Sequence, residues 1–152
     1  MQILLAGFFF DQPVGSWPVS IQVLPSISRV LVAQKASDSI GIIDSSQNRL
    51  IDNIWVGDEP SFILKNSNET EAYISLQGEN TIAVLDTVDM KVLKKIPTVK
   101  APSGMALTPD GKRLYVAAMR SGHPSRFPYT DDDEAYTNRL TLQFAGYLSA
   151  PG

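Results

Sequence analysis

The stretch EAYISLQGENTIAVLD, residues 71–86, decides the fold of this chain. Its two halves are rich in alternating apolar side chains and flank a short polar turn, which is the pattern of two antiparallel strands. The same pattern occurs 42 positions earlier, as RVLVAQKASDSIGIID at residues 29–44. The chain therefore contains a repeating unit with a strand pair at its centre.

Turns and outer positions keep the same period on both sides of this pair. Pro18, Pro60 and Pro102 open successive units of 42 residues. In the third unit, the turn Thr108–Lys112 (TPDGK) places Pro before the bend and Gly where a left-handed conformation is needed. The segment 91–96 (KVLKKI) mixes charged and apolar residues, as an outer, solvent-facing strand does. Four short strands per unit of this length are typical of β-propeller blades.

The sequence thus predicts an all-β chain, a single partial propeller over residues 1–152 whose blades have four antiparallel strands. The repeat units span residues 18–59, 60–101 and 102–143. Propeller rings close with four to eight blades, whereas this chain supplies about three and a half. An incomplete ring leaves apolar faces uncovered. We therefore expect either a protein partner or a second copy to complete the ring, or a chain that is a fragment of a longer protein.

Composition excludes several classes of protein. The net charge is −3 and the basic residues are scattered singly, so we expect no nucleic-acid partner. The chain has no Cys, which excludes disulfides, thiolate metal sites and a cysteine nucleophile. The apolar opening, residues 1–10, is interrupted by Asp11, so we expect a strand there and no membrane span. A clipped export signal is the alternative interpretation of this segment.

Several stretches resemble the Tyr-Val-Thr-Asn (YVTN) type of β-propeller repeat. They are Tyr73–Ser75, Tyr115–Ala117, Thr108–Leu114 and Thr81–Asp86. The resemblance implies a ring of the seven-bladed type, of which this chain holds about three blades. It also implies a place outside the cytoplasm, in the periplasm or at the cell surface. Similar propellers include lactonases, subunits of quinoprotein amine dehydrogenases and haem-binding domains of nitrite reduction.

One unit departs from the repeat and supplies the candidate site. Its next alternating strand is 138–142 (NRLTL), so residues 119–137 form an insertion at the end of the blades where propellers bind ligands. Long loops in compact repeats are commonly functional. The acidic run 131–134 lacks the spacing of a Ca²⁺ loop, and we interpret it as a solvated segment. The predicted ligand-binding residues are Arg120, His123, Arg126, Tyr129 and Tyr136.

The sequence predicts no catalytic residue, metal ligand or cofactor. His123 is the only histidine and has no companion at metal-binding spacing, and no Gly-x-Ser-x-Gly motif is present. We interpret the chain as a non-enzymatic binding or scaffold module that presents loops from one face to a protein, glycan or small ligand. The alternative is a fragment or subunit of a propeller enzyme of the lactonase, quinoprotein dehydrogenase or haem-binding kind. A purely structural segment of a larger ring is a third interpretation.

Overall fold

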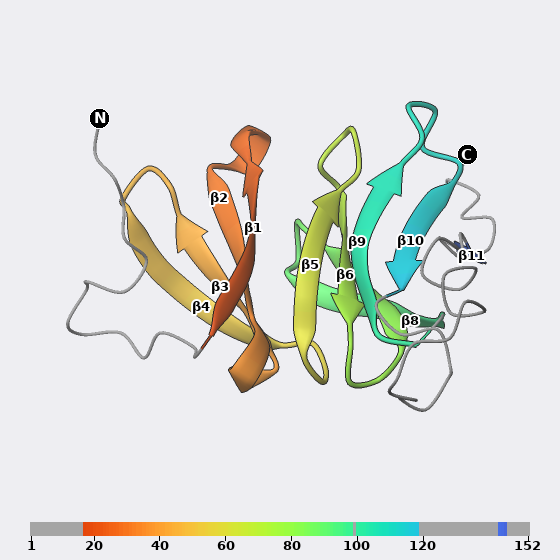
Figure 1. The fold of residues 1–152 in the computed structure, drawn as a ribbon. Coiled ribbons are helices and arrows are strands. Elements are labelled where there is room, and N and C mark those ends of the chain that lie inside the picture. Colours follow the sequence, from red (N-terminus) through yellow and green to blue (C-terminus); the bar gives the residue numbers. More distant parts are fainter. Residues whose placement is uncertain (1–16, 99, 119–142, 146–152) are drawn as a thin grey trace.

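The computed structural model describes residues 17–98, 100–118 and 143–145, which form three antiparallel sheets (Figure 1). Blade 1 consists of β1 (Pro18–Leu24), β2 (Arg29–Gln34), β3 (Ser39–Asp44) and β4 (Arg49–Trp55). Blade 2 consists of β5 (Pro60–Lys65), β6 (Glu71–Leu76), β7 (Thr81–Asp86) and β8 (Lys91–Pro97). Blade 3 consists of β9 (Pro102–Leu107), β10 (Leu114–Ala118) and β11 (Gln143–Ala145). The prediction of an all-β fold with four-stranded blades is confirmed.

In each blade the strands follow one another in sequence order, and the first strands of neighbouring blades contact each other. β1 packs against β5, and β5 packs against β9, so these three strands line one side of the stack (Figure 1). The register repeats with the sequence: Leu31 pairs with Ile42 in blade 1, and Tyr73 pairs with Val84 in blade 2. Alternating side chains on these central strands point to opposite faces of each blade.

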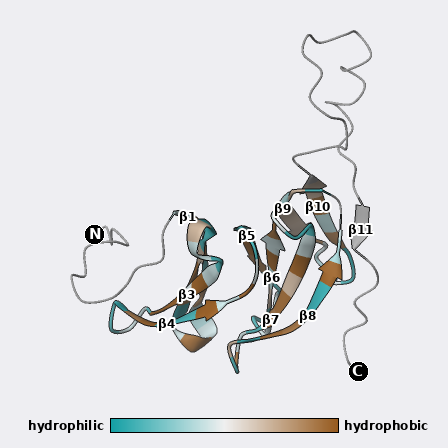
Figure 2. Ribbon diagram, turned by 90° about the horizontal axis from the view of Figure 1, so that it is seen from below, coloured by the Kyte–Doolittle hydropathy of each residue, from teal (hydrophilic) through white to brown (hydrophobic). Residues whose placement is uncertain are grey.

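The two faces of blade 2 belong to two separate hydrophobic cores, one on each side of the blade. Hydrophobic residues recur along the strands of the blades (Figure 2). On β6, Ala72 and Ile74 pack toward blade 1, whereas Tyr73 packs toward blade 3. The core between blades 1 and 2 consists of Leu24, Leu31, Ala33, Ile40, Ile42, Val56, Ile63, Ala72, Ile74, Leu76, Ala83 and Leu85. The core between blades 2 and 3 consists of Tyr73, Ile82, Val84, Met105, Leu114 and Val116. Burial of this apolar area, at about 25 cal/mol per Å², holds the blades together.

The predicted turn at Thr108–Lys112 is confirmed. Gly111 has a φ of 70°, and its N–H donates to the Thr108 carbonyl at 2.8 Å. The middle unit keeps this turn although Glu69 replaces the glycine, with a φ of 59° and an N–H donated to the Asn66 carbonyl at 3.2 Å. The first unit differs, because a short 3₁₀ turn at Pro25–Ile27 shifts the left-handed residue to Ser28.

Residues with a left-handed backbone conformation also recur in the connections between strands. Three of them stand at the start of a blade: Trp17, Glu59 and Ala101 have φ values of 61°, 52° and 50°. Asp44 and Asp86, at the same position of the repeat, cap the turns that follow β3 and β7. Each carboxylate accepts two backbone N–H bonds from the turn that follows it, at 2.8–3.1 Å. A hydrogen bond from the Ser46 hydroxyl, followed by the backbone bonds, lowers the pKa of Asp44, and the backbone bonds lower the pKa of Asp86.

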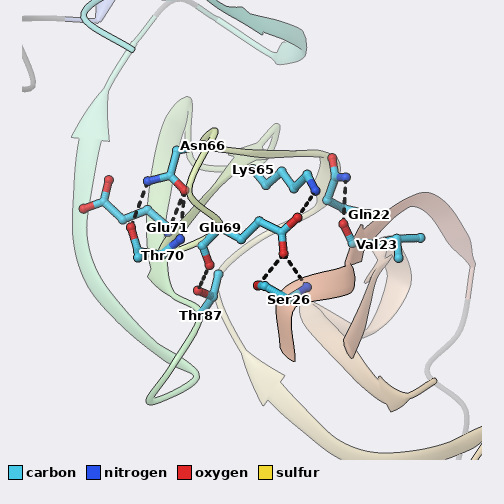
Figure 3. A network of polar contacts seen from close by, with 9 residues as sticks. All are labelled: Gln22, Val23, Ser26, Lys65, Asn66, Glu69, Thr70, Glu71 and Thr87. Atoms are coloured by element: carbon cyan, nitrogen blue, oxygen red, sulfur yellow. Dashed lines mark hydrogen bonds and ion pairs between the residues drawn. The ribbon is translucent and has the colours of Figure 1, made fainter. Parts of the chain in front are cut away.

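Glu69 lies in the turn between β5 and β6, and its side chain joins blade 2 to blade 1 (Figure 3). Its carboxylate accepts hydrogen bonds from the Lys65 ammonium, the Ser26 hydroxyl and the Ser26 N–H, the last at 2.9 Å. Its carbonyl accepts a bond from the Thr87 hydroxyl. The Lys65 bond, followed by the Ser26 bonds, lowers the pKa of Glu69 to about 2.

In blade 3 the strand β11 occupies the place of a third strand, since it pairs with β10 at Tyr115 and Phe144. The predicted strand 138–142 and the predicted insertion 119–137 lie outside the described residues. Within the described ranges, no helix has the length and apolar character needed to cross a membrane.

Candidate functional site

The five predicted ligand-binding residues, Arg120, His123, Arg126, Tyr129 and Tyr136, lie outside the described residues. The predicted insertion follows β10 directly in the sequence. The structure does describe the end of the blades at which β10 terminates. We call this end the top face. It is formed by three connections, Lys35–Asp38, Val56–Glu59 and Gln77–Asn80, together with the chain around Ala101.

The top face is held by hydrogen bonds that repeat from blade to blade. The Asp38 side chain accepts the Glu59 N–H at 3.0 Å, and the Asn80 side chain accepts the Ala101 N–H at 2.9 Å. Asp38 and Asn80 occupy the same position of the repeat, and both have left-handed backbones. Each side chain thus fixes the residue that enters the next blade, so the connections form a preorganised surface.

Lys35 adds a polar contact between blades 1 and 2. Its ammonium donates to the Gln77 side chain at 2.6 Å and lies 3.5 Å from a Glu59 carboxylate oxygen. It also lies 5.9 Å from the centre of the Trp17 ring, within the range of a cation–π contact. The side chains at the top of this junction are therefore ordered by mutual contacts.

An exposed tryptophan stands beside this junction. The Trp55 side chain ends β4 and is 67% exposed, and the Lys95 ammonium lies 4.7 Å from its ring centre. Lys95 also bonds both carboxylate oxygens of Glu79, at 2.7 and 2.9 Å. These bonds lower the pKa of Glu79, whose carboxylate in turn accepts the Asp58 N–H at 2.9 Å. Lys95 is thus fixed over one face of the indole.

Gly57 makes this arrangement possible. Its φ is 131°, a conformation that L residues rarely adopt. A Cβ atom there would stand 2.2 Å from a Glu79 carboxylate oxygen and 2.6 Å from the Lys95 ammonium. Only glycine lets this ion pair lie against the backbone next to Trp55.

Below Trp55 an apolar groove runs between β4 and β8. Its volume is about 370 Å³, and it is lined by Ile54, Trp55, Val56, Met90, Lys91, Val92 and Lys95. The walls are mostly carbon, with two ammonium groups among the lining side chains. A site of this kind binds apolar groups. Its titratable lining residues, Lys91 and Lys95, are ion-paired with Asp89 and Glu79. Among the described residues, no group of three metal-ligating side chains converges on one point.

Sequence reasoning missed the Trp55 site because it looked for a departure from the repeat. Trp55 and Lys95 lie on ordinary outer strands, 40 positions apart in the chain. The sequence did contain a signal for an exposed site at Trp55. A tryptophan in the outermost strand of a blade has no hydrophobic core to pack into, so its side chain is expected at the surface. Its partner Lys95 could be identified only in the folded structure.

These sheets define the class of the protein: the chain is a β-propeller module with part of a ring of blades. No protein-family model matches it. It is similar to antigen Lp49 of Leptospira interrogans, with 35% identity over 86 residues, 57% of this chain and 19% of that protein. It is 28% identical over 109 residues to the seven-bladed β-propeller protein Rv1057 of Mycobacterium tuberculosis, covering 69% of this chain and 28% of the relative. Protein YncE of Salmonella typhi is 23% identical over 105 residues, 69% of this chain and 30% of that protein.

Two solved structures show the same fold. Hydrazine synthase of Kuenenia stuttgartiensis superposes with a TM-score of 0.63 and 22% identity over 74% of this chain and 33% of that one. A protein of unknown function from Desulfotomaculum acetoxidans gives 0.61 and 19%, over 70% and 36%. At these identities the likeness concerns the fold alone. The chain spans only 19% to 30% of the length of the relatives named above.

Proposed function

We propose that this chain is a non-enzymatic binding module of the YVTN propeller type that captures a ligand at its top face. The observation that supports this function best is the exposed Trp55 ring at the mouth of an apolar groove. Large exposed aromatic side chains beside a hollow mark interaction sites more often than isolated exposed residues do. The hydrogen-bonded connections around Trp55 keep it in place, which limits the entropy lost when a ligand binds.

The chemistry of the groove favours a ligand with an apolar or aromatic group. Lys95 occupies one face of the Trp55 indole, so a ligand stacks on the other face or against the ring edge. The carbon walls supplied by Ile54, Met90 and Val92 suit an aliphatic or aromatic side chain of a protein partner. A glycan or small molecule that stacks on Trp55 is the second class of ligand.

The insertion at 119–137 belongs to the same proposal. By the register of the repeat it leaves the top face, and we assign Arg120, His123, Arg126, Tyr129 and Tyr136 to contacts with the same ligand. In this arrangement the described groove supplies the apolar contact, and the insertion supplies charged and aromatic contacts from the next blade. Replacing Tyr129 and Tyr136 by Ala is expected to weaken capture without unfolding the blades.

Two further features complete the proposed function. Display in the periplasm or at the cell surface is supported by the resemblance to YVTN repeats and by the similarity to a protein named as an antigen. The missing blades are supplied by a protein partner or by a second copy of the chain. The number of blades in one relative, seven, supports a ring larger than this chain.

The test screens the full chain against a phage-displayed library of random peptides and a printed glycan array. An enriched ligand is expected to bind Trp55→Ala about 30-fold more weakly, equivalent to about 2 kcal/mol for a central aromatic contact. Leu93→Ala is the matched control, because Leu93 is an exposed apolar residue of β8 outside the groove lining. No enriched ligand in either library, or equal binding by Trp55→Ala and wild type, contradicts the proposal.

A further inference from the structure

The groove below Trp55 lies between two strands whose outer edges have no partner in the described part of the chain. β4 and β8 are each the last strand of their sheet, and they lie on the side of the molecule opposite β1, β5 and β9 (Figure 2). The backbone N–H and C=O groups along such an edge are available for hydrogen bonds with another extended chain. On β8 this edge runs from Lys91 to Ile96, because Pro97 has no N–H. An extended peptide can therefore lie beside the groove and pair with β8.

The groove accepts one row of side chains from such a peptide. Val92 and Lys95 of β8 line it, and they pair with two residues of the core against blade 1, Leu85 and Ala83. Both lining residues therefore stand on the side of blade 2 that faces the groove. The side chains of an added strand alternate in the same way, so every second one enters the groove. The Trp55 indole and the carbon walls receive an aromatic or aliphatic side chain there.

The lysines of β8 determine which charge the peptide carries. All three charged residues of this strand are lysines, Lys91, Lys94 and Lys95. The Lys95 ammonium is held by Glu79 at 2.7 Å, and it already covers one face of the Trp55 ring at 4.7 Å from the ring centre. A fixed cation at the indole repels a second cation brought to the same ring. The site therefore disfavours a lysine or arginine side chain of a ligand.

Lys91 and Lys94 are available for anionic groups of a ligand. The Lys91 ammonium lies 2.6 Å from Asp89, but the two side chains are 59% and 58% exposed, and an ion pair between exposed side chains contributes little to stability. A carboxylate of a ligand can therefore take the place of Asp89. Lys94 is exposed and forms no ion pair with the residues that the structure describes. The charge of β8 is thus complementary to an acidic peptide.

We propose that this site binds an extended, acidic segment of a protein partner, which adds a strand to the edge of β8. The inference rests on the proposed function, because it names the class of partner for the Trp55 site. An aromatic or aliphatic side chain of the segment enters the groove against Trp55, and carboxylates bind Lys91 and Lys94. Lys91 lies about 13 Å from Lys95 along the strand, at about 3.3 Å per residue. The apolar residue of the segment and its distal acidic residue are therefore about four positions apart.

The first test measures peptide binding to the full chain by isothermal titration calorimetry at low ionic strength. The probes are acetyl-Thr-Phe-Glu-Val-Thr-Glu-amide and the same sequence reversed, which covers both strand directions. The matched peptides carry Gln or Lys in place of both Glu residues. The acidic peptide is expected to bind about 10-fold more tightly than the Gln peptide, through two exposed charge contacts, and the Lys peptide is expected to bind most weakly. Equal binding by the acidic and Gln peptides, or no binding by the acidic peptide in either direction, overturns the inference.

Variants of the chain locate the contact. The double variant Lys91→Gln/Lys94→Gln is expected to bind the acidic and the Gln peptide equally. Lys100→Gln/Lys112→Gln is the matched control, because it removes the same charge at two exposed lysines outside the groove lining. A preference for the acidic peptide that survives in the first variant, or is lost in the control, overturns the inference. A Gln peptide that binds as well as the acidic one, and binds more weakly to Trp55→Ala, overturns the acidic partner and leaves the proposed function standing.

A second test examines the pairing with β8. Two versions of the acidic peptide are N-methylated at alternate residues, so that each version loses the N–H groups along one of its two edges. The version methylated on the edge that faces β8 is expected to bind at least about 10-fold more weakly than the other, because its backbone hydrogen bonds are lost. Equal binding by the two versions overturns the addition of a strand.

Discussion

The two junctions between blades share their apolar contacts and the top-face hydrogen bond accepted by Asp38 or Asn80, and they differ in their other polar contacts. Between blades 1 and 2, charged side chains join the blades at both ends, Glu69 at one end and Lys35 at the top face. Between blades 2 and 3, serine hydroxyls bind backbone carbonyls in the described residues: Ser61 to Pro102 at 3.2 Å and Ser75 to Ser103 at 2.9 Å. The repeat thus fixes the packing of each blade on the next, whereas each junction also has polar contacts of its own.

The largest expected effect concerns the shared apolar part. Ile63→Ala removes a fully packed side chain from the core between blades 1 and 2, and we expect the free energy of unfolding to fall by about 3 kcal/mol. Ile51→Ala is the matched control, because Ile51 is exposed on β4, and it should change the free energy by less than about 0.5 kcal/mol. Urea denaturation measures both. Equal losses would mean that Ile63 does not hold the junction.

The serine contacts give the next effect in size. Ser75→Ala removes a buried hydroxyl that bonds Ser61 at 2.8 Å and the Ser103 carbonyl at 2.9 Å. We expect a loss of about 1.5 kcal/mol, because buried partners are left without a hydrogen bond. Ser67→Ala, on an exposed turn, is the control and should be neutral. A neutral Ser75→Ala would show that the second junction depends on its apolar contacts alone.

The charged contact of the first junction gives an effect that depends on pH. The folded pKa of Glu69, about 2, lies below its ordinary value of 4.5, so folding favours the ionised carboxylate. Its contribution to stability is complete above pH 4.5 and disappears as the pH falls toward 2. The stability difference between wild type and Glu69→Gln should therefore shrink over this window. Urea midpoints at pH 7, 4, 3 and 2.5 measure it, and a difference that is constant with pH contradicts the ionic role.

The smallest effect concerns the left-handed residue that begins blade 3. Ala101 has a φ of 50°, which is unfavourable for a residue with a Cβ atom. We expect Ala101→Gly to raise the free energy of unfolding by about 0.5 kcal/mol, the strain relieved being partly offset by the entropy of glycine. Ala106→Gly, in the strand β9, should lower it by a similar amount. If both variants are destabilised equally, left-handed strain at Ala101 is not significant.

The periodic part of the molecule could be predicted from the sequence. The strand pairs β2–β3 and β6–β7 span the predicted stretches 29–44 and 71–86, because alternating apolar side chains between turns define them. The outer strand β8 extends one residue beyond the predicted segment 91–96, to Pro97. The caps at Asp44 and Asp86 were predictable since an Asp side chain bonds the backbone a few residues on.

The contacts that occur only once could not be predicted. Glu69 takes the left-handed place of a glycine, and its partner Ser26 lies 43 positions away. The groove beside Trp55 likewise combines residues of two blades. A period in the sequence shows which positions are equivalent, but it does not show which unlike side chains meet between units. The ligand-binding residues at 119–137 stay predictions, since they lie outside the described residues.

The absence of a side chain at Gly57 has a consequence for how the specificity of the proposed binding site can change. Substitution at this position disturbs the Glu79–Lys95 pair and with it the orientation of the indole. For the proposed ligand, specificity can instead be varied at Met90 and Lys91, which also line the groove and lie outside the connection that contains Gly57. A library directed at the groove should hold residue 57 as glycine and diversify the rim, so that new ligands are selected on an unchanged scaffold.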